Sequence, residues 1–335
     1  MLLQCIAPPC LTVLIPRDSL LVRALHAAAL RFDPKPKDSI LHIPSPCGPS
    51  SHAERMLQPF GWHGLRGLLP SEWEPLAYSI KAEGGRLEFQ TRRGLASVYH
   101  WQIVTQPPDL QRTVASLLEG CSTPGSNLIR QETSMPEWQA WRAEPMGSIG
   151  FARYFPQAQL LALWVFPPDT SAEDWLTVLA KTESNVGKFR RWCLFGIDAL
   201  IPSDYQITRV QVFPANVRLE FNKGKGRYLL AIQRWGLPED ILGGRNLEGL
   251  ARRLLLSTHH RPLRTALTDP TTGGVRMAFR PHRSGRLMRW LGRGRQGEIE
   301  IRPAQKGHRL LLLEQQIPTG APYLSYNDVL PYSIS

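Results

Sequence analysis

Few residues in this sequence have the types and the spacing that metal or catalytic chemistry requires. His259 and His260 are adjacent, so their side chains point in different directions on a helix, and no HxxxH or HxxE pattern accompanies them. A metal ion needs ligands that converge on one point. The helix dipole, which favours histidine near a helix end, explains the pair more simply. We therefore predict no metal site.

The segment Lys223–Arg227 reads Lys-Gly-Lys-Gly-Arg, which invites comparison with phosphate-binding loops. It lacks the GxxxxGK[ST] spacing and lies between two predicted strands. No helix N-terminus is therefore expected to supply amides to a phosphate. We interpret the segment as a basic hairpin turn.

Glu88 and Glu220 occupy the same place in two Arg-Leu-Glu-Phe blocks. Paired carboxylates can perform acid–base chemistry. Cross-strand ion pairing with the neighbouring Arg86 or Arg218 is the simpler interpretation. We predict no catalytic residue and no cofactor.

The cysteines are odd in number and form no CxxC pair. This argues against a disulfide framework and a zinc site, and it favours a reducing compartment such as the cytoplasm. They are Cys5, Cys10, Cys47, Cys121 and Cys193.

The elements that would position such residues come in two copies. Residues 64–73 (GLRGLLPSEW) align with residues 196–205 (GIDALIPSDY), and the two RLEF blocks, 86–89 and 218–221, have the same offset of 132 residues. Two matching blocks at one offset indicate a tandem duplication.

Each copy is predicted to hold three strands, a helix and three further strands. The RLEF blocks alternate apolar and charged residues, as half-buried strands do. Asp109 and Asn246 are typical N-caps of the two central helices, and Ser171 caps a third. The expected fold class is α+β, a tandem duplication of an antiparallel-sheet unit with packed helices.

This element order resembles PsbP-like α/β/α sandwiches, in which an antiparallel sheet carries helices on both faces. The resemblance covers both units at the level of element order, without a residue motif specific to that family. It therefore implies no functional residues, because one fold can host unrelated functions.

The repeat and the composition divide the chain into four parts. A Pro/Ser/Lys-rich stretch indicates a linker before the first copy. An uncharged segment at the start is too short to span a bilayer, so no integral membrane segment is predicted. The parts are a poorly ordered N-terminal extension and linker at 1–55, the first repeat at 56–186, the second at 187–318 and a turn-rich tail at 319–335.

Charge distinguishes the two copies. The formal net charge of the chain is +12, but residues 62–186 carry −3 and residues 187–318 carry +14. The first copy is therefore mildly acidic and the second strongly basic. A charge difference of this kind bears on which molecules the protein binds and does not indicate its fold.

Much of the basic excess lies in an insertion, 280–295, that the first copy lacks. Its basic residues are all arginine, whose guanidinium fits phosphate and carboxylate oxygens and stacks on bases. The predicted binding residues are Arg280, Arg283, Arg286, Arg289, Trp290, Arg293 and Arg295, together with Lys223, Lys225 and Arg227 of the turn.

Several partners suit this composition. They are the backbone of a nucleic acid, an acidic protein surface, including the first unit of the same chain, or, less favoured, an anionic membrane surface. A solvated hairpin that keeps the protein soluble would look the same. Our leading hypothesis is a non-enzymatic binding or assembly protein whose basic second repeat engages an anionic partner. The alternatives are an enzyme with its site between the repeats and a structural subunit of a larger complex.

Overall fold

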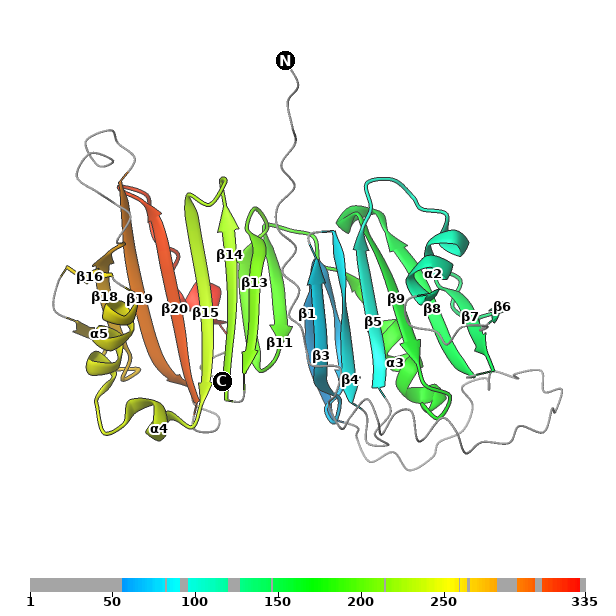
Figure 1. The fold of residues 1–335 in the computed structure, drawn as a ribbon, viewed down its shortest axis with the longest axis horizontal. Helices are drawn as coiled ribbons and strands as arrows, with labels where there is room; N and C mark the ends of the chain where they lie inside the picture. The colour runs from blue at the N-terminus through cyan, green and yellow to red at the C-terminus, as the bar shows by residue number, and fades with distance from the viewer. Residues whose placement is uncertain are drawn as a thin grey trace, which may run out of the picture.

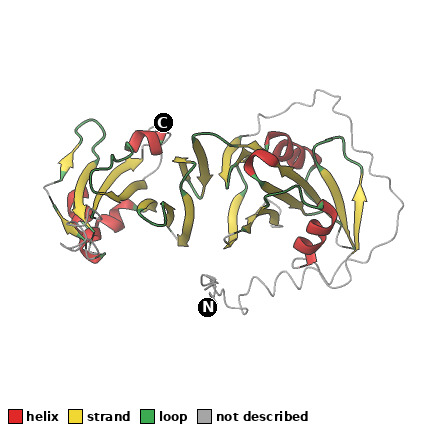
Figure 2. Ribbon diagram, turned by 90° about the horizontal axis from the view of Figure 1, so that it is seen from above, coloured by secondary structure: helices red, strands yellow, loops and turns green. Residues whose placement is uncertain are grey.

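The computed structural model describes residues 56–81, 83–90, 96–119, 127–145, 147–213, 215–258, 260–263, 266–281, 294–304 and 309–331. Of these residues, 54% lie in strands and 17% in helices, and the strands form three antiparallel sheets (Figure 1, Figure 2). The fold is therefore mainly β, and the predicted α+β class is wrong. The extension predicted at 1–55 lies outside the described residues.

The helices are present but short, which is why the predicted class fails. The longest, α2, α3 and α5, each lie over only a few strands (Figure 1). The helices are α2 (Leu110–Glu119), α3 (Ala172–Lys181), α4 (Pro238–Leu242), α5 (Leu247–Ser257), α7 (Tyr326–Val329) and the 3-10 turn η1 (Pro156–Ala158). The predicted caps of α3 and α5 are confirmed, because Ser171 accepts from the Asp174 amide and Asn246 from the Gly249 amide. Among the described helices none has both the length and the apolar character of a membrane span.

The first unit is built on a seven-stranded sheet. In spatial order its strands are β3 (Glu74–Lys81), β4 (Gly84–Gln90), β5 (Ala96–Ile103), β9 (Leu160–Phe166), β8 (Ser148–Phe155), β7 (Gln139–Glu144) and β6 (Asn127–Gln131). The central strand β9 is apolar throughout, because α2 packs on one face of the sheet and α3 on the side of the main core.

The second unit repeats this order. Its strands are β13 (Gln206–Phe213), β14 (Asn216–Lys223), β15 (Tyr228–Gly236), β20 (Arg309–Pro318), β19 (Arg295–Ala304), β18 (Val275–Arg280) and β16 (Arg261–Pro262), and β17 (Leu267–Thr268) also pairs with β18. The two units also share an irregularity in strand pairing. The β3–β4 ladder shifts register between Pro75 and Ala77, and the β13–β14 ladder shifts at the equivalent Ile207 and Arg209.

A third sheet joins the two units. Its strands are β10 (Glu183–Ser184), β2 (Leu65–Pro70), β1 (Leu57–Trp62), β11 (Phe189–Leu194) and β12 (Ile197–Pro202). β1 and β11 are equivalent strands, and they pair at Gly61 and Cys193, which are equivalent residues. Tyr78 donates from its hydroxyl to the carbonyl of Val210, 3.4 Å away and 132 positions later. The units are thus related by approximate two-fold symmetry through the central sheet.

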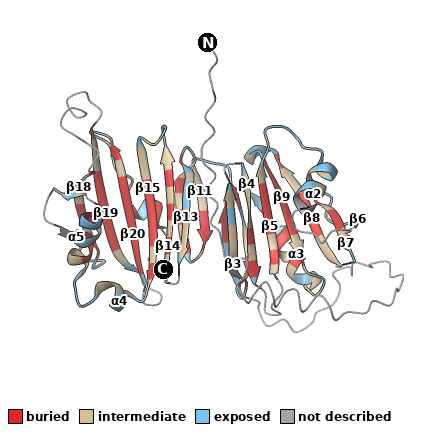
Figure 3. Cartoon of the chain, in the orientation of Figure 1, coloured by how far each residue is buried: buried red, intermediate tan, exposed pale blue. Residues whose placement is uncertain are grey.

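One aromatic core runs through both units. Trp62, on β1, is fully buried, and its ring centroid lies 5.2 Å from that of Trp192 on β11 and 6.0 Å from that of Trp101 on β5. Buried residues follow β5 and β9 in one unit and β15, β20 and β19 in the other (Figure 3). The predicted boundary at 186/187 falls between β10 and β11, and the core continues across it.

The segment predicted as a turn-rich tail packs against the second unit. Tyr326 and Val329 of α7 are buried in the main core, and α7 contacts β12 as α3 contacts β2. Gln315 holds the segment by two hydrogen bonds to the backbone of Leu324, at 2.8 and 2.9 Å. We therefore describe this segment with the second unit.

Gly61 is required where the two units meet. A Cβ atom at this position would lie 2.6 Å from the carbonyl oxygen of Arg191 and 3.1 Å from the amide nitrogen of Cys193. Because both neighbours are backbone atoms, Gly61→Ala must force β1 and β11 apart. We expect it to lower the free energy of unfolding by about 1–3 kcal/mol, as overpacking does.

Urea denaturation followed by circular dichroism measures this loss. Gly187→Ala is the control, because the nearest atom to its Cβ, the Phe189 carbonyl oxygen, is 3.8 Å away. Equal stability of the two variants would contradict the assigned strand pairing.

Candidate functional site

The predicted basic binding residues that the structure describes lie at one end of the sheet of the second unit. This is the upper end in Figure 1, where β14 ends and β19 begins. Arg280 is the last residue of β18 and Arg295 the first of β19. The other predicted residues of the insertion, Arg283, Arg286, Arg289, Trp290 and Arg293, lie outside the described residues.

Arg295 links the insertion to the basic turn. Its Nη2 atom donates a hydrogen bond of 2.8 Å to the carbonyl oxygen of Gly226, 69 positions earlier in the chain. Gly226 belongs to the turn Lys223–Arg227, which joins β14 to β15 and so confirms the predicted hairpin. Three consecutive residues of this turn, 224–226, have positive φ, which explains its two glycines. The two basic segments therefore meet in space.

Lys223 is engaged within the fold. Its Nζ atom is 2.6 Å from a carboxylate oxygen of Asp204 and lies 5.1 Å from the ring centroid of Tyr228. These contacts neutralise its charge and fix its position. Lys225 and Arg227 are instead exposed, so they are the members of the turn that can meet a partner.

Two further arginines face each other on neighbouring strands. Arg261 of β16 is exposed, and it lies directly opposite the half-buried Arg280 of β18. Like charges opposite each other destabilise an antiparallel pair, and an anion bound between them would relieve that repulsion. We call Lys225, Arg227, Arg261, Arg280 and Arg295 the basic sheet end.

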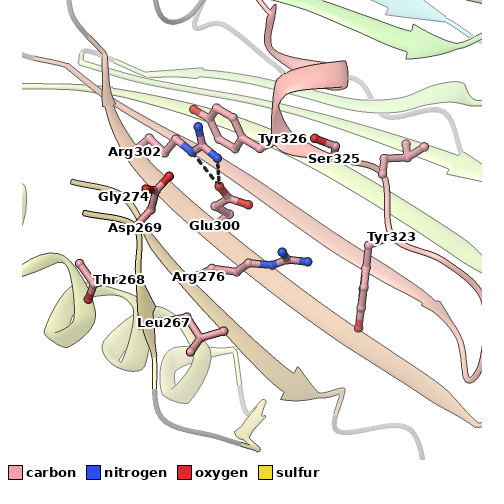
Figure 4. A pocket seen from close by; sticks show the side chains of 11 residues that line it. Leu267, Thr268, Asp269, Gly274, Arg276, Glu300, Arg302, Tyr323, Ser325 and Tyr326 are labelled. Carbon is pink, nitrogen blue, oxygen red and sulfur yellow. Dashed lines mark hydrogen bonds and ion pairs between the residues drawn. The ribbon is translucent and has the colours of Figure 1, made fainter. Parts of the chain in front are cut away.

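A second candidate lies on the same sheet and was not predicted from the sequence. A cavity of about 390 Å³ opens between β18, β19 and the C-terminal segment. Figure 4 shows Arg276, Glu300 and Arg302 on one sheet face, with Tyr323 and Tyr326 of the C-terminal segment across from them. We call it the polar pocket.

Two ion pairs organise the polar pocket, one between β18 and β19 and one within β19. Arg276 Nη2 is 2.7 Å from Oε2 of Glu298, and Arg302 Nη2 is 2.6 Å from Oε1 of Glu300. Arg302 also donates to the side chain of Asn327 at 3.0 Å. Both glutamates are only 8% exposed. Carboxylates are almost never buried to this extent without a partner, so the arrangement depends on both arginines.

The environment shifts the proton affinities of the pocket residues. Burial raises the pKa of the Glu298 carboxyl, and the hydrogen bond from Arg276 offsets part of that rise. The same hydrogen bond raises the pKa of the Arg276 guanidinium. Burial, together with the charge of Glu298, raises the pKa of the Tyr323 hydroxyl to about 12. Perturbed groups beside a cavity are a feature of functional sites as well as of structural ion pairs.

No protein-family model matches this chain, and no curated protein is similar enough to match it. The resemblance to PsbP-like proteins therefore stays a prediction. The function has to be argued from the geometry of the site.

The duplication reveals what is unusual about the polar pocket. Residues of the second unit can be assigned counterparts in the first. The RLEF strands β4 and β14 are aligned first, and the paired residues of each neighbouring strand are then matched in turn. Arg276 and Glu300 line the pocket, and Glu298 and Gln315 support it through their contacts with Arg276 and Leu324. The counterparts of Arg276, Glu298, Glu300 and Gln315 are, in that order, Ala140, Ile149, Phe151 and Phe166. At these four positions the first unit is apolar, and Phe151 stacks on Trp175 of α3 with centroids 4.8 Å apart. One copy thus has charged residues where the other has core residues. Arg302 instead corresponds to another arginine, Arg153.

A smaller cavity of about 300 Å³ lies on the opposite face, beside α5. There Arg218 forms ion pairs with Glu220 at 2.7 Å and with Glu314 at 2.9 Å. Glu220 is paired with Arg218 and Glu88 with Arg86, the predicted partners, but each pair lies along one strand rather than across two. Both cavities are lined entirely by the second unit.

The remaining candidates have structural explanations. The His260 ring stacks on Phe279 with centroids 4.7 Å apart, and His259 lies outside the described residues. Cys193 is buried, and burial raises the pKa of its thiol to about 12, which makes it a poor nucleophile. The described part of the chain contains no group of three histidine, cysteine or acidic side chains placed to bind a metal.

Proposed function

We propose that this protein is a non-enzymatic binding protein whose second unit engages the phosphate backbone of a nucleic acid through the basic sheet end. The observation that carries the proposal is the hydrogen bond from Arg295 to Gly226, which joins two basic segments far apart in the sequence. A phosphate backbone offers a row of anions that such a surface matches.

The charge split supports the same conclusion. The second unit carries the basic excess, and the first is mildly acidic. Arginine predominates at the basic sheet end, and its guanidinium forms bidentate contacts with phosphate oxygens. The first unit would then serve to hold the second in shape through the shared central sheet. We place this activity in the cytoplasm, consistent with the five unpatterned cysteines.

We expect binding to a nucleic-acid oligomer to weaken steeply as salt rises, because phosphate contacts release counterions. Replacing Lys225 and Arg227 by alanine removes two exposed cations. The slope of log K against log salt should then become shallower by about 1.4 for a single strand or about 1.8 for a duplex. Fluorescence anisotropy with a labelled 20-nucleotide strand and its duplex measures both slopes.

The control removes the same charge from the first unit. Lys81 and Arg112 are exposed there, so the double alanine variant at these positions should leave the slope unchanged. Equal slopes for the two double variants, or no binding at 50 mM salt, would contradict the proposal. Retention of polyglutamate in preference to nucleic acid would replace it with an acidic protein partner.

The enzyme alternative gains no support from the cavities. An active site between the repeats needs a cavity lined by both units, and both cavities described above belong to the second unit.

A further inference from the structure

We propose that the polar pocket is a binding site for a small zwitterion of the α-amino-acid type, with Arg276 receiving its carboxylate and Glu300 its ammonium group. The proposal is independent of nucleic-acid binding. It rests on residues on a different part of the second unit from the basic sheet end.

The first argument is the comparison between the two copies. At the positions of Arg276, Glu298 and Glu300 the first unit has apolar residues that pack in or against its core, so the fold does not need charges at these positions. Replacing a buried ion pair by apolar residues of similar volume is often neutral or stabilising. Charges kept at a site where they do not favour folding indicate a functional demand.

The second argument is the hydrogen-bonding capacity left in the pocket. Arg302 uses its three nitrogens on Glu300 and Asn327. It thereby orients the Glu300 carboxylate through a single oxygen, Oε1, and leaves Oε2 available as an acceptor. Arg276 uses Nη2 on Glu298. Its side chain is 50% exposed, so its other N–H groups can reach a ligand.

The third argument is the spacing of these two groups. Arg276 and Glu300 are directly opposite on β18 and β19, which sets their Cβ atoms about 5 Å apart on one face. Both side chains line the same cavity, so a small ligand that carries a carboxylate and an ammonium group on one carbon atom can contact the two of them at once. An anion alone would leave the Glu300 oxygen unsatisfied, and a cation alone would leave Arg276 unsatisfied.

The walls of the pocket complete the site. Tyr323 and Leu324 of the C-terminal segment line it opposite the sheet, and Gln315 fixes that segment through the Leu324 backbone. The pocket therefore offers an aromatic and an aliphatic surface to a ligand side chain. Its volume of about 390 Å³ lies within the range of small-ligand sites.

The test uses the full chain and a panel of the twenty free amino acids, each with its amide and its N-acetyl derivative. Thermal unfolding followed by fluorescence should show a rise of roughly 2–4 °C in midpoint for at least one amino acid at a concentration well above its dissociation constant. The amide and the N-acetyl derivative of that amino acid should give no rise. Calorimetric titration then measures its affinity.

The decisive variant installs the residues of the first unit. In Arg276→Ala with Glu298→Ile the whole ion pair is removed, so the protein should fold with unchanged or higher midpoint while affinity falls at least tenfold. Arg252→Ala, on the exposed surface of α5, is the control and should keep full affinity. Binding that survives in the double variant, or a panel in which no amino acid raises the wild-type midpoint, would overturn the proposal.

Discussion

Replacing Trp62 by alanine is expected to lower the free energy of unfolding by about 3–5 kcal/mol, the range of large aromatic truncations in cores. The side chain is fully buried, and its ring makes edge contacts with the rings of Trp101, Trp192 and Phe195. Trp101 belongs to the first unit and the other two to the second. The cavity left by the substitution would therefore weaken both units together.

Guanidinium chloride denaturation, followed in parallel by tryptophan fluorescence and circular dichroism, measures this effect. A single transition in both signals, moved to lower denaturant, is the expected result, because the units share one core and one sheet. Phe213→Ala is the matched control, since Phe213 is 55% exposed and should cost less than about 0.5 kcal/mol. A loss below 1 kcal/mol for Trp62→Ala, or separate transitions in the wild type, would contradict the shared core.

The second large effect is a loss of stability in weak acid. Burial, with a contribution from Arg190, lowers the pKa of His63 from its usual 6.5 to about 3. Burial, with a contribution from Arg86, lowers the pKa of His100 to about 4. The His63 ring is enclosed by aromatic rings and stacks on Trp101 with centroids 5.0 Å apart. Both imidazoles are therefore held neutral in the folded protein.

The direction of the pH effect follows from proton binding. Below pH 6.5 the unfolded chain takes up a proton on each histidine, whereas the folded protein does not until pH falls to about 4 for His100 and about 3 for His63. The unfolded state therefore binds more protons in this window, and stability falls as pH falls. Each histidine contributes up to about 1.4 kcal/mol per pH unit, and full stability is present above pH 6.5.

The second unit supplies a control for this prediction. Its residue at the position of His100 is Gln233, which accepts a hydrogen bond from Arg218 just as a glutamine at 100 would from Arg86. His100→Gln should reduce the loss between pH 7 and pH 4.5 by about 2–3 kcal/mol. Urea titrations at several pH values measure the difference. Parallel pH profiles for the variant and the wild type would show that His100 is not held neutral.

Local sequence patterns predicted several elements of the fold correctly. The helices capped by Ser171 and Asn246, the hairpin at Lys223–Arg227 and the ion pairs of Glu88 and Glu220 all depend on residues close together in the chain. The equivalence of the two copies up to β4 and β14 also follows from the sequence, because no insertion interrupts the offset of 132 residues before the RLEF blocks. The fold class was not predicted correctly, because the length of a strand depends on the strands it pairs with, and the sequence does not show which strands those are.

The two candidate sites differ in the same way. Composition predicted the basic segments, because a run of arginines is visible without knowing the fold. The polar pocket was missed because insertions in the second copy change the offset between the units beyond β14. Only the strand registers align Glu300 with Phe151 and Arg276 with Ala140.

The sequence by itself determined that this protein is a duplication with one mildly acidic and one strongly basic copy. Local signals carry that information, since repeated blocks, caps and charge counts need no tertiary contacts. The tertiary structure decided that the copies share a central sheet through Gly61 and Cys193, and that Arg295 reaches Gly226. It also decided which charged residues face a cavity. These contacts join residues that are far apart in the sequence. Their energies depend on burial and on strand register, and the folded chain alone determines burial and register.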